Sequence, residues 1–479
     1  MPDAQPVIAS EFAASFKGFM DTVIAQAPRE EFFFVKVLRQ HFGTEGDLSE
    51  FPIVGETFSR TDHPNIHLAL QEYLDAPGRE HTLYGVEVPN EHMGIRLATF
   101  TQEHVEAWQR PRKVPAEYVN IPLEDDRTLP CLTRGLYLIR ENDRRLAVLV
   151  QGPSLSQWGP QSVQIEVMTT QRAEGEEFLR TMRATMHARN VYRGHIISLE
   201  PGPGGAAIKF HRLPNISRDN IILPQGVIER IERHAIGFTR VETKLRAARR
   251  HMKRGLLLHG PPGTGKTLTA MYLATQMANR TIILITGPAM GLIEQACQMA
   301  RLLQPATIIL EDVDLIAEER TYQNTGTNAL LFELLNQMDG LSEDADVLFL
   351  LTTNRPEILE PALASRPGRV DQAILVPLPD AECRRKLIAL YSEGMTVRLS
   401  DLDGLVAKTE GVSAAFIREL MRKAALFAAD ESGPDEGIVV EDRHVNASLH
   451  ELVVEGGELT KQLLGVGTGF GSRQRAACG

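Results

Sequence analysis

The sequence predicts an α/β fold in which a parallel sheet carries a phosphate-binding loop, a helical lid follows the sheet, and a separate α+β domain precedes it. Three observations predict this fold. Apolar runs alternate with helical patterns between residues 254 and 378, and the Gly-rich turn GPPGTGKT follows the first of these runs. Only helical periodicity follows residue 379, whereas residues 1–205 mix both kinds of element.

The first half of the chain combines helical and extended patterns. The segment EEFFFVKVLRQHFG gathers apolar residues on one helical face, and EGEEFLRTMRATMHARN repeats them at helical spacing. Two alternating runs in RLAVLVQGPSLSQWGPQSVQIEVM, divided by Gly, Pro and Ser, indicate a hairpin, and GHIISLE is typical of a strand. This half shows no repeat and no catalytic motif, so its function stays open.

Gly and Pro suggest where the domains meet. The clearest break is EPGPGG, residues 200–205, and the stretch HRLPNISRDNIILPQG after it is typical of an approach to a new domain. The Gly-rich end, GVGTGFGSRQRAACG, is typical of a mobile tail. The expected parts are an N-terminal α+β domain at 1–205, a linker at 206–221, a large α/β subdomain at 222–378, a helical lid at 379–455 and a tail at 456–479.

Five strands are expected in the α/β region. They are RGLLLH, TIILIT, ATIILED, DVLFLLTTN and QAILVPL, the first four of which are separated by helical stretches. Near-continuous apolar strands of this kind are typical of a parallel sheet that is covered on both faces. After the sheet, the lid is expected to be wholly helical, with helices in DAECRRKLIALYSEG, LDGLVAKTEG, VSAAFIRELMRKAALFAADE and EDRHVNASLHELV.

Composition and charge restrict the class of protein. The chain has 479 residues, enough for two or three domains, and a net charge of −11, which gives no overall attraction to nucleic acid or to an anionic membrane. Its four cysteines form no CxxC pair, and its longest apolar runs are far shorter than the roughly 18 residues that cross a bilayer. Because the N-terminus also lacks the pattern of a secretion signal, a cytoplasmic protein is expected.

The strongest motif in the sequence is GPPGTGKT, residues 260–267, which fits the pattern G-x-x-x-x-G-K-[ST] between a strand and a helix. Its glycines let the backbone turn its N–H groups toward phosphates, while the lysine reaches the β- and γ-phosphates and the threonine offers its hydroxyl to Mg²⁺. A nucleotide and Mg²⁺ are therefore expected at this loop. The expected cofactor-binding residues here are Gly260, Pro261, Pro262, Gly263, Thr264, Gly265, Lys266 and Thr267.

Residues 255–378 resemble the ATPase module of the AAA family, the ring-forming subset of AAA+ proteins. The resemblance rests on four motifs in order: GPPGTGKT, IILEDVD, LLNQMDGL and TTNRPEILEPALASRPGRVD. The helical stretch to about residue 455 resembles the lid of that family. The stretches RGLLLHGPPGTGKT and LEDVD are similar to those of the mitochondrial Rieske-protein translocase, whose membrane anchor is not expected in this chain.

The resemblance implies roles for further residues. Asn354 matches the polar sensor that positions the attacking water, and Arg366 and Arg369 match arginine fingers that act on a neighbouring subunit's nucleotide. The alternative for the two arginines is an ordinary surface turn. Ala414 and Ala415 match the small residues that pack on the nucleotide, although a helix start capped by Ser413 explains the same sequence.

The acidic strand IILEDVD departs from the usual order, in which Asp precedes Glu. The simplest alignment gives Glu311 the metal side, directly or through water, and Asp312 the water side, with Asp314 as a fallback acid. Since both positions keep a carboxylate, we expect a working but slow ATPase. The expected catalytic residues are Asp312, Glu311, Asn354, Arg366, Arg369 and Lys266, and the expected metal ligands are Thr267 and Glu311.

Two other features bear on the partner. The stretch GPAMGLIEQACQMARLLQP is short for a substrate-threading loop and has no aromatic residue, so Met290 with Gly291 is the nearest candidate and a core methionine is the alternative. The basic run KLRAARRHMKR, residues 244–254, is better explained by a solvated or subunit-facing helix than by a nucleic-acid contact, since no aromatic residue is interleaved.

Together these features predict a homo-oligomeric ring, most simply a hexamer, that couples ATP hydrolysis to remodelling or assembly of a protein partner bound through the N-terminal domain. One alternative is a ring scaffold that binds ATP with negligible hydrolysis. The other is an AAA+ motor or loader on nucleic acid, which the acidic net charge disfavours.

Overall fold

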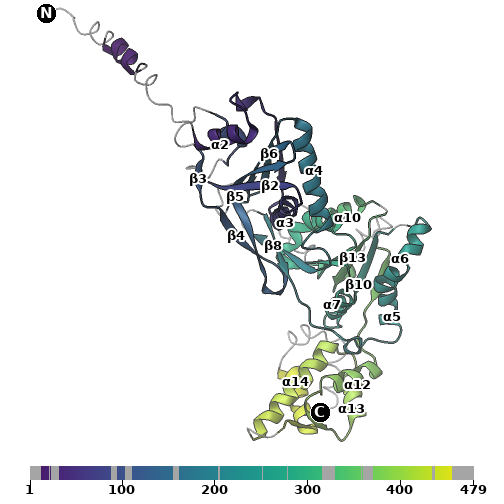
Figure 1. Cartoon of the computed structure of the whole chain (residues 1–479). Coiled ribbons are helices and arrows are strands. Elements are labelled where there is room, and N and C mark those ends of the chain that lie inside the picture. The colour runs from purple at the N-terminus through teal and green to yellow at the C-terminus, as the bar shows by residue number, and fades with distance from the viewer. Residues whose placement is uncertain are drawn as a thin grey trace, which may run out of the picture. The chain divides into compact units, whose positions relative to one another are not determined.

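The computed structural model of the chain separates into two compact units (Figure 1). Unit 1 contains residues up to 120 and residues 130–186, and unit 2 contains residues 121–129 and those from 187 onward. The structure describes residues 12–20, 22, 32–87, 94–102, 110–154, 161–202, 205–250, 252–277, 279–314, 329–342, 344–357, 359, 370–433 and 437–455.

Unit 1 is an α+β domain built on a seven-stranded sheet, in the order β1-β7-β6-β5-β2-β3, with β4 paired to β5. The pairs β6–β7 and β2–β5 are antiparallel, and the β6–β7 pairing confirms the expected hairpin. The strands are β1 (Ile53–Phe58), β2 (Arg79–Glu87), β3 (Arg112–Val114), β4 (Glu117–Pro122), β5 (Thr128–Glu141), β6 (Arg144–Gln151) and β7 (Val163–Met168).

Successive side chains of these strands point to opposite faces of the unit 1 sheet, and both faces carry apolar residues. One face packs against α3 (His63–Leu74) and α4 (Arg172–Ala188), for example through Leu70 and Phe178. The opposite face packs against α2 (Phe33–Phe42), whose Phe34 and Leu38 contact the strand residues of that side. Because both faces are covered, this unit has its own hydrophobic core.

Unit 2 holds a second seven-stranded sheet, in the order β14-β10-β13-β12-β11-β8-β9. Every neighbouring pair is parallel except β8–β9, which is an antiparallel hairpin. The strands are β8 (Ile196–Gly202), β9 (Gly205–Phe210), β10 (Arg254–His259), β11 (Thr281–Ile285), β12 (Ala306–Leu310), β13 (Val347–Thr353) and β14 (Gln372–Leu375).

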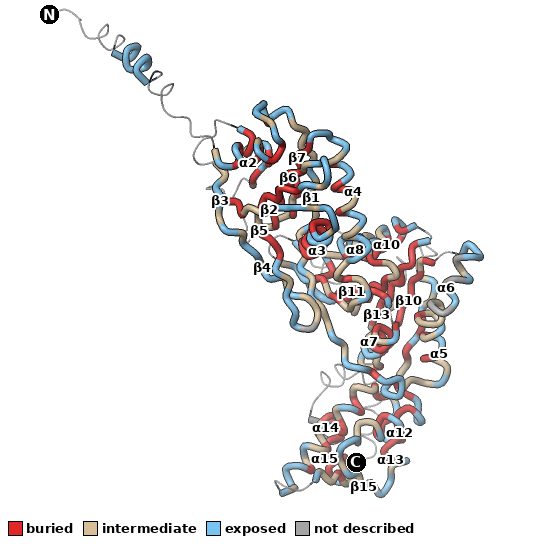
Figure 2. Tube along the Cα trace, viewed as in Figure 1, coloured by how far each residue is buried: buried red, intermediate tan, exposed pale blue. Residues whose placement is uncertain are grey.

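Helices cover both faces of the unit 2 sheet, as the apolar strands require. One side packs against α8 (Ile293–Leu302) and α10 (Ala329–Asp339), and the other against α5 (Val227–Glu232) and α7 (Lys266–Gln276). Figure 2 shows the central strands β10 and β13 as buried segments between these layers. A further helix, α6 (Phe238–Ala247), contains the start of the basic run. The parallel sheet predicted from the sequence is confirmed.

The expected boundary at residue 205 needs correction. Residues 196–210 form β8 and β9, and β8 extends the parallel sheet by pairing Ile196–Ser198 with β11. The division between the units therefore falls near residue 187. EPGPGG suggested a domain break because Gly and Pro also mark hairpins, and here the segment lies at the connection between two strands of one sheet.

The lid follows the sheet and contains α12 (Ala381–Leu390), α13 (Leu402–Lys408), α14 (Ala414–Glu431) and α15 (Asp442–His450). It is not wholly helical, because Thr396–Arg398 (β15) pairs in parallel with Val439–Glu441 (β16). Three-residue strands are too short to show a period in the sequence. The expected tail at 456–479 lies outside the described residues. Over the described part of the chain, no helix has both the length and the apolar character to span a membrane.

Candidate functional site

The phosphate loop connects β10 to α7 and depends on glycine at two crowded positions. Gly260 has a φ of +146° and Gly263 a φ of +74°. A Cβ atom on Gly260 would lie 2.3 Å from the carbonyl oxygen of Val376, and one on Gly263 would lie 2.7 Å from the Ser413 hydroxyl oxygen. No side chain fits at those separations, so the loop takes this shape only with glycine.

Lys266 begins α7 with its ammonium group turned into the loop. Its Nζ donates hydrogen bonds of 2.8 Å to the carbonyl oxygens of Gly260 and Pro261, and only 5% of the residue is exposed. Burial lowers the pKa of Lys266 to about 8, although the carboxylates of Asp312 and Asp314 oppose this change. The ammonium group therefore lies between the loop and the acidic segment at residues 311–314, where an anionic ligand would raise its pKa again.

The lid closes directly on the phosphate loop. Ser413 caps α14 by accepting a hydrogen bond of 3.2 Å from the Phe416 backbone, and the Ala415 backbone N–H donates one of 3.0 Å to the Gly263 carbonyl oxygen. Ala414 and Ala415 line the adjacent cavity. The helix cap by Ser413 is therefore present, and the packing of the two alanines on a nucleotide stays a prediction.

A cavity of about 330 Å³ lies between the phosphate loop, the lid and residues 220–223. Of the residues expected from the sequence, Gly260, Pro261 and Glu311 are outside its lining, and Thr267 lies on it with an exposed hydroxyl-bearing side chain. The lining residues are Asn220, Ile221, Ile222, Leu223, Pro262, Gly263, Thr264, Gly265, Lys266, Thr267, Leu268, Thr269, Asp312, Asn354, Leu387, Tyr391, Ala414, Ala415 and Arg418.

The acidic segment, residues 311–314, follows β12, which ends at Leu310, and its Asp312 lines this cavity. The Asp312 carboxylate accepts a hydrogen bond of 3.1 Å from the side-chain amide of Asn354, and both residues line the cavity. Asp314 accepts hydrogen bonds from the Thr353 hydroxyl at 2.8 Å and from the Asn354 backbone at 3.2 Å. Asp314 is thus a structural acid that holds Asn354, and Asp312 is the acid that faces the cavity.

Glu311 lies apart from the cavity lining. One of its carboxyl oxygens is buried and has no hydrogen-bond partner among the described residues. Burial, followed by the neighbouring charge of Asp312, raises the pKa of Glu311. This geometry does not give Glu311 direct access to a cation in the cavity, so of the two forms expected from the sequence it favours contact through water.

The comparison with known families decides the kind of domain. Residues 256–378 match the model of the ATPase family associated with various cellular activities (AAA). The chain contains an AAA ATPase domain. The matched range runs from β10 past β14, and therefore contains the phosphate loop, the acidic segment and Asn354.

Curated relatives are similar to part of this chain. The chain is 36% identical over 191 residues to the proteasome-activating nucleotidase of Pyrococcus horikoshii. The alignment covers 37% of this chain and 47% of the nucleotidase. It is 34% identical over 188 residues to the 26S proteasome regulatory subunit S10B homolog B of Arabidopsis thaliana. That alignment covers 36% of this chain and 47% of the Arabidopsis protein. The chain thus spans about half the length of these relatives. The alignment with a solved katanin structure covers 53% of this chain and 90% of the katanin chain, with 26% sequence identity and a TM-score of 0.41.

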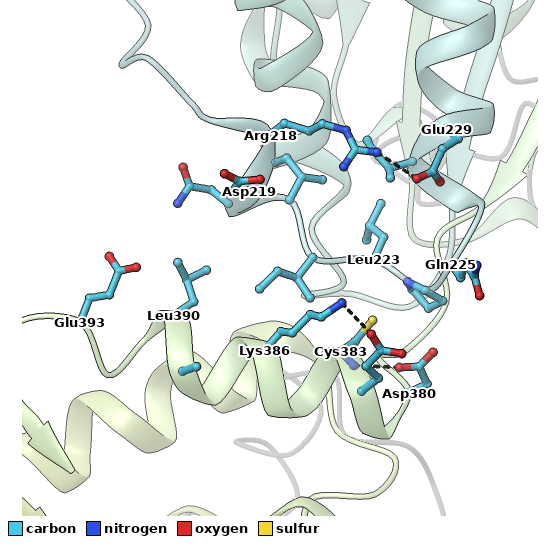
Figure 3. Close-up of a pocket in the computed structure, with 17 residues that line it drawn as sticks. Arg218, Asp219, Leu223, Gln225, Glu229, Asp380, Cys383, Lys386, Leu390 and Glu393 are labelled. Atoms are coloured by element: carbon cyan, nitrogen blue, oxygen red, sulfur yellow. Dashed lines mark hydrogen bonds and ion pairs between the residues drawn. The ribbon is translucent and has the colours of Figure 1, made fainter.

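The segment at residues 217–225, here called the strap, was not recognised from the sequence as part of the site. Its residues 220–223 form one wall of the cavity beside the phosphate loop and also line a larger groove of about 790 Å³ on the side of α12. Figure 3 shows this groove with Arg218 and Glu229 on one side and Asp380, Cys383 and Lys386 of the α12 region on the other. In the sequence only the run NIILPQG could have indicated this role, and such a run is also typical of an apolar linker.

Ion pairs fix the strap to α5. Arg218 contacts Glu229 at 2.9 Å and Glu232 at 3.1 Å, both on α5. The Tyr272 hydroxyl on α7 donates a hydrogen bond of 2.6 Å to the same Glu232 carboxylate. Because α7 starts at Lys266, these contacts join the strap to the helix that follows the phosphate loop.

Two expectations remain, one for the two arginines and one for Met290. Arg366 and Arg369 lie outside the described residues. Met290, the candidate for a threading loop, is only 5% exposed and packs in the core with α8, so the alternative of a core methionine is confirmed. Met290 is therefore not presented as a threading side chain in the described structure.

Proposed function

We propose that the protein is a Mg²⁺-dependent ATPase that assembles as a ring and uses ATP hydrolysis to remodel or assemble a protein partner. The observation that carries the proposal is the hydrogen bond between Asp312 and Asn354 inside a cavity that also contains Lys266 and Thr267. An acid, a polar amide, a lysine and a hydroxyl around one cavity are the groups that phosphoryl transfer to water needs.

The cavity fits a nucleoside triphosphate. The loop glycines, which take positive φ angles, and the start of α7 favour phosphates at that end. The opposite part of the lining is apolar, with Ile221, Ile222 and Leu387, and so favours the base. On this arrangement Lys266 leaves the loop carbonyls and turns its ammonium group to the phosphates.

Asp312 and Asn354 are assigned to the water that attacks the γ-phosphate. The Asp312 carboxylate accepts the proton of that water, and Asn354 holds its orientation while hydrogen-bonded to the same carboxylate. Thr267 offers its hydroxyl to Mg²⁺, and Glu311 contributes through water. When bound, the metal supplies positive charge to the β- and γ-phosphates.

The ring is proposed from residues of the AAA domain and from the relatives. Arg366 and Arg369 are assigned as fingers that complete the site of a neighbouring subunit, which requires an oligomer, most simply a hexamer. The relatives named for the proteasome support a protein partner. Unit 1, with its own core and no share in the cavity lining, is assigned to partner recognition.

The alternative is a ring scaffold with negligible hydrolysis. It is favoured by the position of Glu311, which leaves Asp312 as the single cavity acid among the described residues. Against it, the contact between Asp312 and Asn354 is one that nucleotide binding alone does not need.

Phosphate release measured at several protein concentrations distinguishes the ring ATPase from the ring scaffold. Turnover should rise with assembly and fall about 10³-fold or more in Arg369→Ala and in Lys266→Ala. Matched controls are Lys386→Ala and Arg385→Ala, exposed residues of α12 outside the cavity lining. Assembly with ATP but without phosphate release would support the scaffold, and equal turnover in all four variants would contradict the proposed site.

A further inference from the structure

Thr352 makes an unusual contact at the point where β12 ends. Its hydroxyl oxygen accepts a hydrogen bond of 3.0 Å from the backbone N–H of Asp312, and the residue is fully buried in β13. The neighbouring backbone N–H, that of Glu311, still bonds to the Ile285 carbonyl oxygen of β11 at 3.3 Å. The amide of Glu311 therefore donates to β11 and the amide of Asp312 to β13. The acceptor is a backbone carbonyl in the first case and a side-chain hydroxyl in the second.

The hydroxyl of Thr352 replaces a backbone partner that the sheet no longer offers. Pairing between β12 and β13 stops at Leu310, opposite Leu351, so the next amide that points to β13 has no carbonyl in register. A buried amide without a partner is costly, because it has lost its hydrogen bonds to water. Thr352 satisfies this amide while the chain turns away from the strand.

The turn places Asp312 in the left-handed region, with a φ of +50°. Asp and Asn adopt this conformation far more readily than other residues with a side chain, because their short polar groups bond locally. This conformation is compatible with the reversed order of the acids. The position that faces the cavity needs a residue that tolerates a positive φ, and Asp meets that need better than Glu.

We propose that Thr352 is a positioning residue for the hydrolytic site. Through its hydroxyl group it holds the Asp312 backbone in the left-handed turn, and that turn keeps the Asp312 carboxylate on the side-chain amide of Asn354. Asp314 completes the arrangement from the other side, by binding the Thr353 hydroxyl and the Asn354 backbone. The end of β13 and the acidic segment thus fix each other's geometry.

The inference rests on the proposed ATPase function and is tested by a pair of variants at one position. Thr352→Val keeps the shape of the side chain and removes the hydroxyl, whereas Thr352→Ser keeps the hydroxyl. Thr281→Val is the matched control, because Thr281 is also a fully buried strand threonine whose hydroxyl is bonded, here to Leu303 at the far end of the sheet.

Steady-state ATP hydrolysis by the full-length chain is the first measurement. We expect kcat to fall about tenfold in Thr352→Val with KM changed less than about twofold, and Thr352→Ser to stay within about threefold of the parent. A kcat unchanged in Thr352→Val would overturn the proposal. So would a serine variant as slow as the valine variant, or an equal loss in Thr281→Val.

Hydrogen exchange of the segment 306–314 is the second measurement, and it does not depend on activity. Exchange at Asp312 should be faster in Thr352→Val than in the parent and in Thr352→Ser, since only the valine variant leaves that amide unpaired. Unchanged exchange would contradict the contact itself. If the parent protein hydrolyses no ATP, the proposed function fails, and the exchange result still decides whether Thr352 holds the turn.

Discussion

The backbone N–H of Ala415, in the first turn of α14, donates a hydrogen bond of 3.0 Å to the carbonyl oxygen of Gly263 in the phosphate loop. A lid element and the nucleotide-binding loop are therefore joined without a side chain between them. The contact is possible because both residues are small: a Cβ atom on Gly263 would lie 2.8 Å from the Ala415 Cβ. A displacement of the Gly263 carbonyl oxygen would therefore alter a hydrogen bond of the first turn of α14.

The first prediction concerns this contact. Gly263→Ala should weaken nucleotide binding about tenfold or more, because the added methyl group forces α14 away from the loop in addition to straining a left-handed backbone. Gly226→Ala is the matched control, since Gly226 also has a positive φ, +80°, and no atom near its Cβ position. Titration of a fluorescent nucleotide measures both variants. Equal losses in the two would mean that backbone strain alone is responsible.

The second prediction separates the two acids. Asp312→Asn should retain bound ATP without turning it over, because asparagine keeps the left-handed backbone and the size of the side chain but cannot accept the proton. Glu311→Gln should turn over ATP but require more Mg²⁺. Single-turnover assays with labelled ATP at several Mg²⁺ concentrations measure both effects. Normal turnover by Asp312→Asn would show that the base has been assigned to the wrong residue.

Much of unit 2 was predictable because its signals are local. The strands RGLLLH and TIILIT are apolar runs bounded by turns, and the phosphate loop is a contiguous motif between a strand and a helix. The two cavity residues Asp312 and Asn354 each follow an apolar strand, so their meeting at one sheet edge follows from the parallel order. These expectations depend on few tertiary details.

The rest was not predictable, since it depends on contacts between distant segments. β8 joins the parallel sheet through β11, which lies more than 80 residues later in the chain, and nothing in GHIISLE specifies that partner. The strap contributes four cavity residues through its path along the loop and α12, not through a motif. The positive φ of Asp312 depends on the Thr352 hydroxyl, and the sequence order of the acids alone did not reveal it.

A third prediction concerns the ion pairs of the strap. Arg218→Ala should raise the dissociation constant for ATP severalfold, because loss of both contacts with α5 lets the wall at residues 220–223 move. The effect should be modest, since Arg218 is itself partly exposed. Arg422→Ala is the control, because Arg422 pairs with Glu419 on α14 away from the cavity lining. A loss of affinity in the control alone would contradict the role of the strap.

A fourth prediction concerns acid and unit 1. Burial lowers the pKa of His41 and of His67 to about 4, so the unfolded chain binds a proton at each below about pH 6.5 while the folded chain does not. The free energy of unfolding should therefore fall as pH decreases from about 6.5 to about 4, by at most about 1.4 kcal/mol per pH unit for each histidine.

Urea unfolding at several pH values, followed by near-ultraviolet circular dichroism, measures this dependence. His41→Gln should remove about half of the slope that the two residues contribute. His81→Asn, at an exposed position of β2, serves as the control and should leave the slope intact. A slope unaffected by His41→Gln would mean that other groups control the acid sensitivity of unit 1.

The last prediction reverses the two acids. The double variant Glu311→Asp, Asp312→Glu has the order usual for such segments, and on charge alone it should be at least as active as the parent. The structure predicts the opposite, because glutamate at position 312 would have to adopt a φ of +50° and because a longer side chain would displace the amide of Asn354. We expect kcat to fall about tenfold or more, with nucleotide affinity retained. If the exchanged order hydrolyses ATP faster, the left-handed turn does not select aspartate, and the acids are reversed for a reason unrelated to Thr352.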